Sequence, residues 1–169
     1  REELVSFAIT NQRETTVAWD RETGKSICNA IVWQCARAES ICKRHTDLAE
    51  AVRHNTGLNL SPYFPASKMQ WIMENVPAAA ALAAEHKLVM GTIDSWLLSF
   101  LTEERVLKTD YTNASRTQLF NIHELKWDSE LCEAFKIPMD ALCEVCMSDA
   151  CFGTTTLGGY LETPIPIYA

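Results

Sequence analysis

The sequence lacks a long apolar run and lacks any excess of positive charge, and each absence removes a class of partner. No stretch of the 169 residues approaches the roughly 18 consecutive apolar residues that a membrane-spanning helix needs. The net charge is −7, and the small basic group Lys43-Arg44-His45 does not reverse it. Acidic chains bind nucleic acid and anionic membrane surfaces poorly. We therefore expect no nucleic-acid partner and no membrane partner.

The cysteines also lack the pattern of a structural framework. There are seven of them, at positions 28, 35, 42, 132, 143, 146 and 151, an odd number in irregular spacing. This argues against a set of disulfides and for a reducing, cytoplasmic location. Cys143 and Cys146 form a single C-x-x-C pair with no histidine nearby. A zinc ribbon needs two such pairs, so we expect no metal site here.

The length fits one domain, and both ends suggest a longer protein. A chain of 169 residues hides about two-thirds of its unfolded surface, and 47% hydrophobic content is ordinary for a globular fold. The chain starts at Arg1 without a methionine and ends on the apolar "TPIPIYA". We therefore expect residues 1–169 to be a piece that is incomplete at both ends.

The first 33 residues favour antiparallel β structure. Residues 5–10 are typical of a buried strand, and residues 15–19 and 26–33 are rich in strand-forming residues. The turn "DRETGK" lies between the last two, with Gly24 at the position that favours a positive φ. The pattern predicts a hairpin over residues 15–33.

The remainder is mostly helical in its pattern. Apolar residues recur at helical spacing over residues 36–54, which predicts a helix, and Gly57 is expected to end it. Further helices are predicted at 67–75, 79–87, 96–102 (capped by Asp94 or Ser95) and 130–135 (capped by Ser129), with a loop and a short strand over 109–121. Strands followed by helices indicate a mixed α/β fold.

One short segment stands out chemically. In "ITNQRETTVAWD" a predicted buried strand breaks into an adjacent cation and anion, Arg13 and Glu14, flanked by amides. Two interpretations are open. The pair binds a polyhydroxylated ligand, or it is an ion pair on the surface.

Six stretches, taken in order, resemble the FGGY family of carbohydrate kinases. They are "TNQRETT" (10–16), "DRETGK" with "AIVWQC" (20–35), "NTGL" with "PYF" (55–64), "YFPASKMQWIMEN" (63–75), "GTIDSWLL" (91–98) and "TDYTNASRTQLFNIHELKWD" (109–128). The fourth fits the first signature of the family, and "NQRETT" with "DYTNASRT" resembles the branch that phosphorylates glycerol. The similarity covers nearly the whole chain.

The resemblance implies a fold and a reaction. The family fold is built on the ribonuclease-H-like core of the actin-like ATPases, and residues 1–169 resemble most of its N-terminal, substrate-binding domain. The implied activity of the full-length enzyme is transfer of the γ-phosphate of ATP, with Mg²⁺, to glycerol, giving sn-glycerol 3-phosphate. The resemblance places the catalytic aspartate beyond Ala169, so no catalytic residue and no bound cofactor are expected in this piece.

The resemblance also names the substrate-binding residues. Arg13 and Glu14 correspond to the pair that hydrogen-bonds glycerol, Trp33 to an apolar wall, and Tyr63 to a phenol that reaches another hydroxyl. A guanidinium only donates hydrogen bonds and a carboxylate only accepts them, so together they orient each O–H group. For Trp33 and Tyr63 the alternative is ordinary packing. We assign Lys68 and Trp71 to packing, and Asn113, Ser115 and Arg116 to ordering of a loop.

Two departures leave alternatives open. The family often has "WQCRRT" where this chain has "WQCARA", with Ala36 and Ala38 replacing an arginine and a threonine. These changes suit an FGGY kinase for another polyol or sugar with a wider pocket. A third alternative is a truncated, non-catalytic domain used for binding or assembly. A homodimer or homotetramer is the oligomeric state that the resemblance implies.

Overall fold

The structure is a computed structural model that describes residues 4–169. Its strands are β1 (Phe7–Ala8), β2 (Thr16–Asp20), β3 (Leu88–Thr92), β4 (Lys108–Asp110), β5 (Phe120–Asn121), β6 (Lys126–Trp127), β7 (Glu144–Cys146), β8 (Gly153–Thr155) and β9 (Ile165–Tyr168). Its α-helices are α1 (Glu39–Arg44), α2 (Ala49–Thr56), α3 (Pro65–Asn75), α4 (Pro77–Ala84), α5 (Ile93–Leu101), α6 (Tyr111–Ala114) and α7 (Ser129–Ala134). Short 3-10 helices cover Ala36–Ala38, Thr46–Leu48 and Met139–Ala141. This mixture of helices and strands confirms the predicted fold class.

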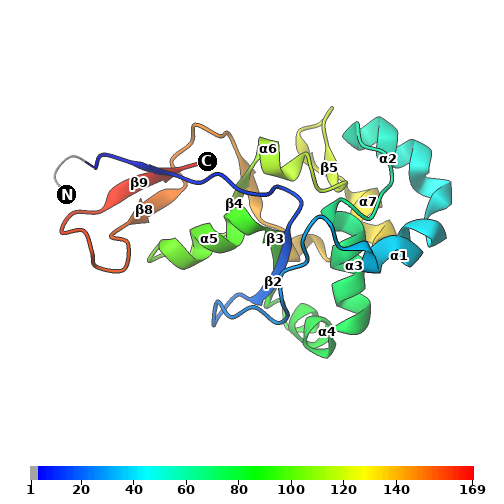
Figure 1. Cartoon of the computed structure of the whole chain (residues 1–169), viewed down its shortest axis with the longest axis horizontal. Coiled ribbons are helices and arrows are strands. Elements are labelled where there is room, and N and C mark those ends of the chain that lie inside the picture. The colour runs from blue at the N-terminus through cyan, green and yellow to red at the C-terminus, as the bar shows by residue number, and fades with distance from the viewer. Residues whose placement is uncertain (1–3) are drawn as a thin grey trace.

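The centre of the molecule is the antiparallel pair β2–β3, in which Thr16 lies opposite Thr92 and Asp20 opposite Leu88 (Figure 1). Successive side chains of a strand point to opposite faces. Accordingly, Ala18 belongs to the largest apolar core, whereas Val17 and Trp19 belong to a second core on the other face. Because both faces are covered, the strands are almost entirely buried and show no polar alternation.

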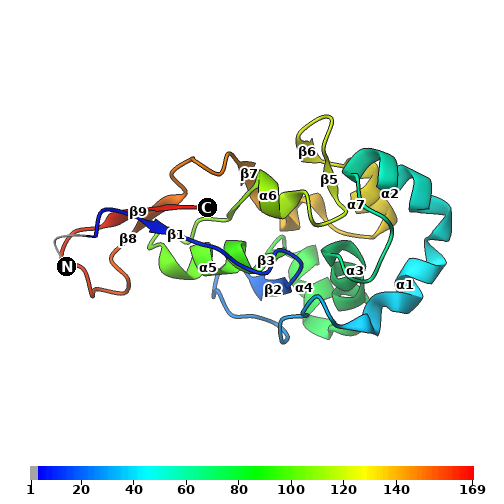
Figure 2. The same ribbon diagram turned by 45° about the horizontal axis from the view of Figure 1, so that its top comes forward.

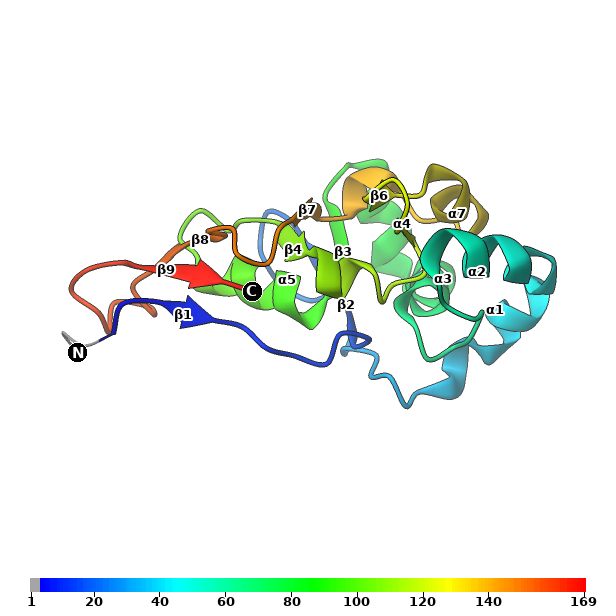
Figure 3. The same cartoon turned by 90° about the horizontal axis from the view of Figure 1, so that it is seen from above.

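Four helices lie on one side of this pair together with the small sheet β5–β6, and α5 lies on the other side near the three-stranded sheet (Figure 1). α1, α2, α3 and α7 lie together at one end, and β1, β8 and β9 lie at the opposite end (Figures 1 and 3). The three-stranded sheet has the order β1-β9-β8, with β1 parallel to β9, and β4 pairs with β7 in parallel. β1 and β9 run side by side (Figure 2). Strands from the two ends of the sequence are therefore neighbours in space.

No helix among residues 4–169 is long and apolar enough to cross a membrane.

The predicted hairpin over residues 15–33 is only partly present. The chain does return beside β2, with hydrogen bonds between the backbones of Thr16 and Ile31 and from Ile27 to Ala18. Between these points residues 28–30 bulge away, so 26–33 is not a continuous strand. Along its whole length β2 pairs with β3 instead. Gly24 has φ +70°, as the turn predicted.

The helical predictions were right in type and wrong at several boundaries. The helix expected over 36–54 is divided at His45, and Gly57 ends α2 with φ +72° as expected. Ser129 is the first residue of α7, whose cap is Asp128, accepting from the backbone N–H of Leu131 at 3.0 Å. α5 begins at Ile93, and Thr92 occupies its N-cap position without a side-chain hydrogen bond to the helix. The Asp94 and Ser95 caps were therefore wrong.

Candidate functional site

Glu14 lies just before β2 and is only 7% exposed. Its Oε1 atom accepts a hydrogen bond from Nε of Arg116 at 2.7 Å. The two residues are 102 positions apart, so the contact joins the segment before β2 to the turn after α6. A buried carboxylate needs such a partner, because an unpaired charge away from water is costly.

Arg13 does not pair with Glu14. Its guanidinium donates to the backbone carbonyl of Thr112 at 3.4 Å, and it lines an open pocket of about 490 Å³. Asn11, Asp110 and Asn113 line the same pocket. Arg13 and Glu14 therefore point in different directions, Arg13 into this pocket and Glu14 toward Arg116. The surface ion pair considered from the sequence is not present between these two residues.

Three aromatic side chains near Arg116 contact one another in sequence. The guanidinium of Arg116 lies over the ring of Phe64, 4.9 Å from the centroid, in a cation–π contact. Phe64 meets Tyr63 edge-on at 5.1 Å, and Tyr63 meets Trp33 at 5.5 Å with a 54° tilt. Trp33 is 36% exposed, so it is not a core residue. The structure therefore brings Trp33 and Tyr63 together and connects them to Glu14 through Arg116.

Lys68 holds the backbone under these rings. It lies in the first turns of α3, fully buried, and its ammonium donates to the carbonyl oxygens of Tyr63 and Phe64. Burial lowers the pKa of Lys68 to about 8, although the nearby Cys35 and Glu14 favour the charged form. The sequence assigned Lys68 to packing, and the structure shows in addition that its ammonium fixes the backbone at Tyr63.

We expect the stability contributed by Lys68 to rise with pH. In the folded protein its pKa is about 8, below the ordinary value of 10.5. Between these values the unfolded chain binds more protons, so the free energy of unfolding increases as pH rises. Relative to Lys68→Met, the wild type should gain about 2–3 kcal/mol between about pH 7 and about pH 10 in urea unfolding. Lys43→Met, at a 75% exposed side chain, is the control and should show no such gain.

A hydrogen-bonded chain behind Arg13 fixes the pocket wall. The carboxylate of Asp110, 2% exposed, accepts from Nδ2 of Asn113 at 2.7 Å and from the hydroxyl of Ser148 at 2.6 Å. Asn113 in turn accepts from Nδ2 of Asn11 at 2.9 Å. Burial alone would raise the pKa of Asp110, but the hydrogen bonds from Ser148 and Asn113 outweigh it and hold the pKa below its usual value.

Replacing Asp110 by Asn should lower the free energy of unfolding by about 2 kcal/mol at neutral pH, since hydrogen bonds to a charged group are lost. Because the folded pKa of Asp110 is lowered, its stabilisation exists above the unfolded value near 3.8 and is lost as pH falls below it. Urea unfolding of wild type and variant should therefore converge in acid. The exposed neighbour Asp149, changed to Asn, should match wild type throughout. A difference that persists in acid would contradict this account.

Sequence reasoning missed two members of the site. Arg116 was assigned to loop ordering, and Phe64 was not singled out. The signal was present, because "DYTNASRT" was recognised as diagnostic together with "NQRETT", and the structure shows the two stretches in contact. Ala38 is fully buried in the main core and Ala36 is exposed. Ala38 therefore lines the core and does not widen a pocket.

No group of three or more His, Cys, Asp or Glu residues within residues 4–169 could hold a metal ion. All seven cysteines are free thiols. Among them, backbone and side-chain hydrogen bonds from Arg37 lower the pKa of Cys35, and burial raises the pKa of Cys143 to about 12.

Known proteins resemble this chain in sequence. Glycerol kinase of Shewanella baltica (strain OS185) is 53% identical over 160 residues, which are 94% of this chain and 32% of that protein. Glycerol kinase of Psychromonas ingrahamii is 48% identical, covering 98% of this chain and 33% of that protein. The chain therefore spans about a third of the length of the relatives that it matches.

Solved structures resemble it in fold. Plasmodium falciparum glycerol kinase with ADP superposes with a TM-score of 0.89 at 35% identity, covering 98% of this chain and 34% of that one. A ligand-bound xylulose kinase from Lactobacillus acidophilus has a TM-score of 0.83 at 19% identity, over 98% and 34% of the two chains, which speaks to the fold alone.

The family comparison agrees with the motifs. The N-terminal domain of the FGGY family of carbohydrate kinases matches residues 1–167, almost the full length. The fold, the relatives and the six stretches of the sequence lead to the same family. The chain belongs to the FGGY family of carbohydrate kinases.

Proposed function

We propose that residues 1–169 are the substrate-binding N-terminal domain of an ATP-dependent glycerol kinase and carry part of the glycerol pocket. The observation that supports this best is the Glu14 carboxylate, 7% exposed and fixed by Arg116. Glu14 supplies a fixed acceptor and the next residue in sequence, Arg13, supplies donors toward a neighbouring pocket, a combination that suits a molecule whose hydroxyls both donate and accept. The names of the relatives suggest the substrate class, a small polyol.

Each of the four proposed residues has a distinct part in binding. Arg13 donates to glycerol oxygens, and the free oxygen of Glu14 accepts from a hydroxyl. Trp33, tilted against Tyr63 and partly exposed, covers the carbon backbone. The phenol of Tyr63 reaches another hydroxyl. Held in this way, a terminal hydroxyl is oriented before reaction, which is the main protein contribution to phosphoryl transfer.

The reaction needs groups that we do not assign to these residues. In the complete enzyme the γ-phosphate of ATP would pass to a terminal hydroxyl of glycerol, releasing ADP and sn-glycerol 3-phosphate. The base is expected to be an aspartate beyond Ala169. We assign no Mg²⁺ ligand to the described residues. We infer that the chain alone binds and orients the polyol without turnover.

The free thiols favour a reducing compartment, and we therefore propose a cytoplasmic enzyme. Self-association as a homodimer or homotetramer remains a prediction from the family. Size-exclusion chromatography with light scattering measures it directly.

Calorimetric titration with related polyols tests the proposed substrate. Glycerol should bind to the 169-residue chain. Propane-1,2-diol, which lacks one terminal hydroxyl, should bind at least about tenfold more weakly, because a buried polar group then stays unpaired. Xylulose should not compete. Tighter binding of xylulose would point to a sugar kinase, and no binding of any polyol by folded protein would favour a non-catalytic domain.

A further inference from the structure

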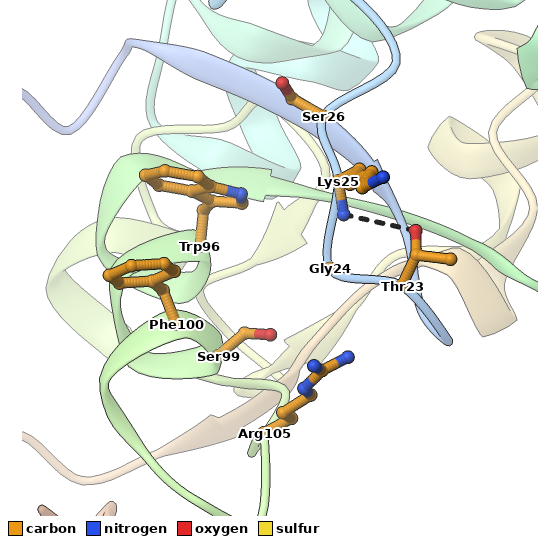
Figure 4. A pocket seen from close by; sticks show the side chains of 8 residues that line it. All are labelled: Thr23, Gly24, Lys25, Ser26, Trp96, Ser99, Phe100 and Arg105. Carbon is orange, nitrogen blue, oxygen red and sulfur yellow. Dashed lines mark hydrogen bonds between the residues drawn. The ribbon is translucent and has the colours of Figure 1, made fainter. Parts of the chain in front are cut away.

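A second hollow lies away from the proposed glycerol pocket. It has a volume of about 590 Å³ and is lined by the turn Thr23–Ser26, by Trp96, Ser99 and Phe100 of α5, and by Arg105 (Figure 4). None of these residues lines the pocket that contains Arg13. Its volume is within the range of about 300–1,000 Å³ that is usual for small-molecule sites.

Two stacked aromatic side chains form one wall of the hollow. Trp96 and Phe100 are one turn apart on α5, and their rings stack at 5.8 Å with only 16° between the planes (Figure 4). Trp96 packs against the core formed with Val17, Trp19 and Val89, so the wall is rigid. Phe100 is nevertheless 72% exposed. Because Trp96 covers one face of Phe100, the outer face of Phe100 is the one left to stack against a further planar ring.

The opposite side carries positive charge. Arg105 donates through Nη1 to the backbone carbonyl of Glu22 at 2.7 Å, which places the guanidinium beneath Gly24 with further N–H donors unused. Lys25 also lines the hollow. In a chain of net charge −7, two cations with no carboxylate among the lining residues form a local site for an anion.

Nearby acidic residues do not neutralise this side. The carboxylate of Glu22 lies 3.3 Å from the ammonium of Lys87. Glu103 and Glu104 precede Arg105 but do not line the hollow. The hydroxyls of Ser26 and Ser99 have no side-chain hydrogen bond to another residue within 4–169, and Figure 4 shows Ser99 on the face of α5 toward Arg105. Ser26 is exposed and Ser99 is only 6% exposed, so Ser26 is the more accessible partner for a sugar hydroxyl.

We propose that this hollow is a second ligand site that takes a nucleoside monophosphate. The base stacks on the outer, exposed face of Phe100, which Trp96 backs from the other side, the phosphate is bound by Arg105 and Lys25, and a serine hydroxyl meets the ribose. The combination of a stacking wall and two cations selects this class, since neither a free phosphate nor an uncharged nucleoside uses both sides. The site is independent of the proposed glycerol site.

The test is an NMR titration of the 169-residue chain with adenosine monophosphate, adenosine and inorganic phosphate. Adenosine monophosphate should shift the amides of Gly24, Ser99 and Arg105 saturably, and each of the other two probes should bind at least about tenfold more weakly. Equal binding of phosphate alone would mean an adventitious anion site, and equal binding of adenosine would mean that the cations are not used. Either result, or no shift in folded protein, overturns the proposal.

Variants separate the two sides of the hollow. Phe100→Ala should weaken binding about tenfold through the loss of stacking, and Lys25→Gln should weaken it by about fivefold. Both side chains are exposed, so the fold should persist. Tyr160→Ala, at a 75% exposed aromatic outside the hollow, is the matched control. Unchanged affinity in both hollow variants contradicts the proposed site. Glycerol shifts at Trp33 should be the same in all three, which keeps this result separate from the proposed function.

Discussion

Replacing Glu14 by Gln should weaken glycerol binding by about thirty- to a thousandfold, which corresponds to about 2–4 kcal/mol for the loss of one hydrogen-bonded charge at a buried contact. Gln keeps the shape of the side chain but replaces one of two acceptor oxygens by a donor. The change therefore removes acceptor capacity at the point where Arg116 and a hydroxyl of glycerol both need it. Calorimetric titration of glycerol into wild type and variant measures the effect.

The matched control is Glu74→Gln. Glu74 also accepts from an arginine, Arg44, at 2.6 and 2.8 Å, but at the surface. Its replacement should leave glycerol affinity within about twofold of wild type, since exposed pairs contribute little. If Glu14→Gln binds glycerol as well as Glu74→Gln does, Glu14 is not a ligand of glycerol.

Replacing Arg116 by Met should lower the free energy of unfolding by about 3 kcal/mol and abolish measurable glycerol binding. The variant leaves the Glu14 carboxylate buried without its cation, and the loss of one partner of a buried pair typically costs about 3–5 kcal/mol. The lower end applies because the side chain of Arg116 is 28% exposed. The ring of Phe64 also loses the guanidinium above it. Urea unfolding and glycerol titration of the same samples give both quantities.

Two further variants serve as controls for Arg116→Met. Arg44→Met breaks the exposed pair with Glu74 and should cost less than about 1 kcal/mol. Arg116→Lys keeps the charge but not the planar stacking on Phe64, so we expect an intermediate loss. A double-mutant cycle between Glu14 and Arg116 should show strong coupling. Additive effects would mean that the two residues act separately.

Local sequence patterns predicted turns and helices better than strands. The buried strand expected over residues 5–10 is only β1, which is not buried, and the patterns did not predict the central strand β3 or β7, β8 and β9. The turn at Gly24 and the end of α2 at Gly57 were right because a positive φ is a local demand. The hairpin of residues 15–33 was only partly right, because the choice between residues 26–33 and β3 depends on a pairing about 70 positions away. Ser129 was predicted to cap α7, but the cap is the preceding residue, Asp128, whose side chain is also a good N-cap.

The candidate site shows the same division between local and distant information. Arg13, Glu14, Trp33 and Tyr63 were proposed from the resemblance of short motifs. That Glu14 is held by Arg116, and Arg13 by the carbonyl of Thr112, follows only from the folded chain. Periodicity carries no information on contacts that span 102 positions. The sequence could place "NQRETT" and "DYTNASRT" in one family but could not show that they touch.

The most direct test of the central claim is a site-resolved titration of the chain with glycerol, in which NMR follows the Nε–H of Arg13 and the indole N–H of Trp33. If these residues line one glycerol pocket, both signals should shift along the same saturation curve, and the shift of the Trp33 indole should disappear in Arg13→Ala. If folded protein shows no shift at either position at millimolar glycerol, or if the two signals follow different curves, the proposed pocket is wrong.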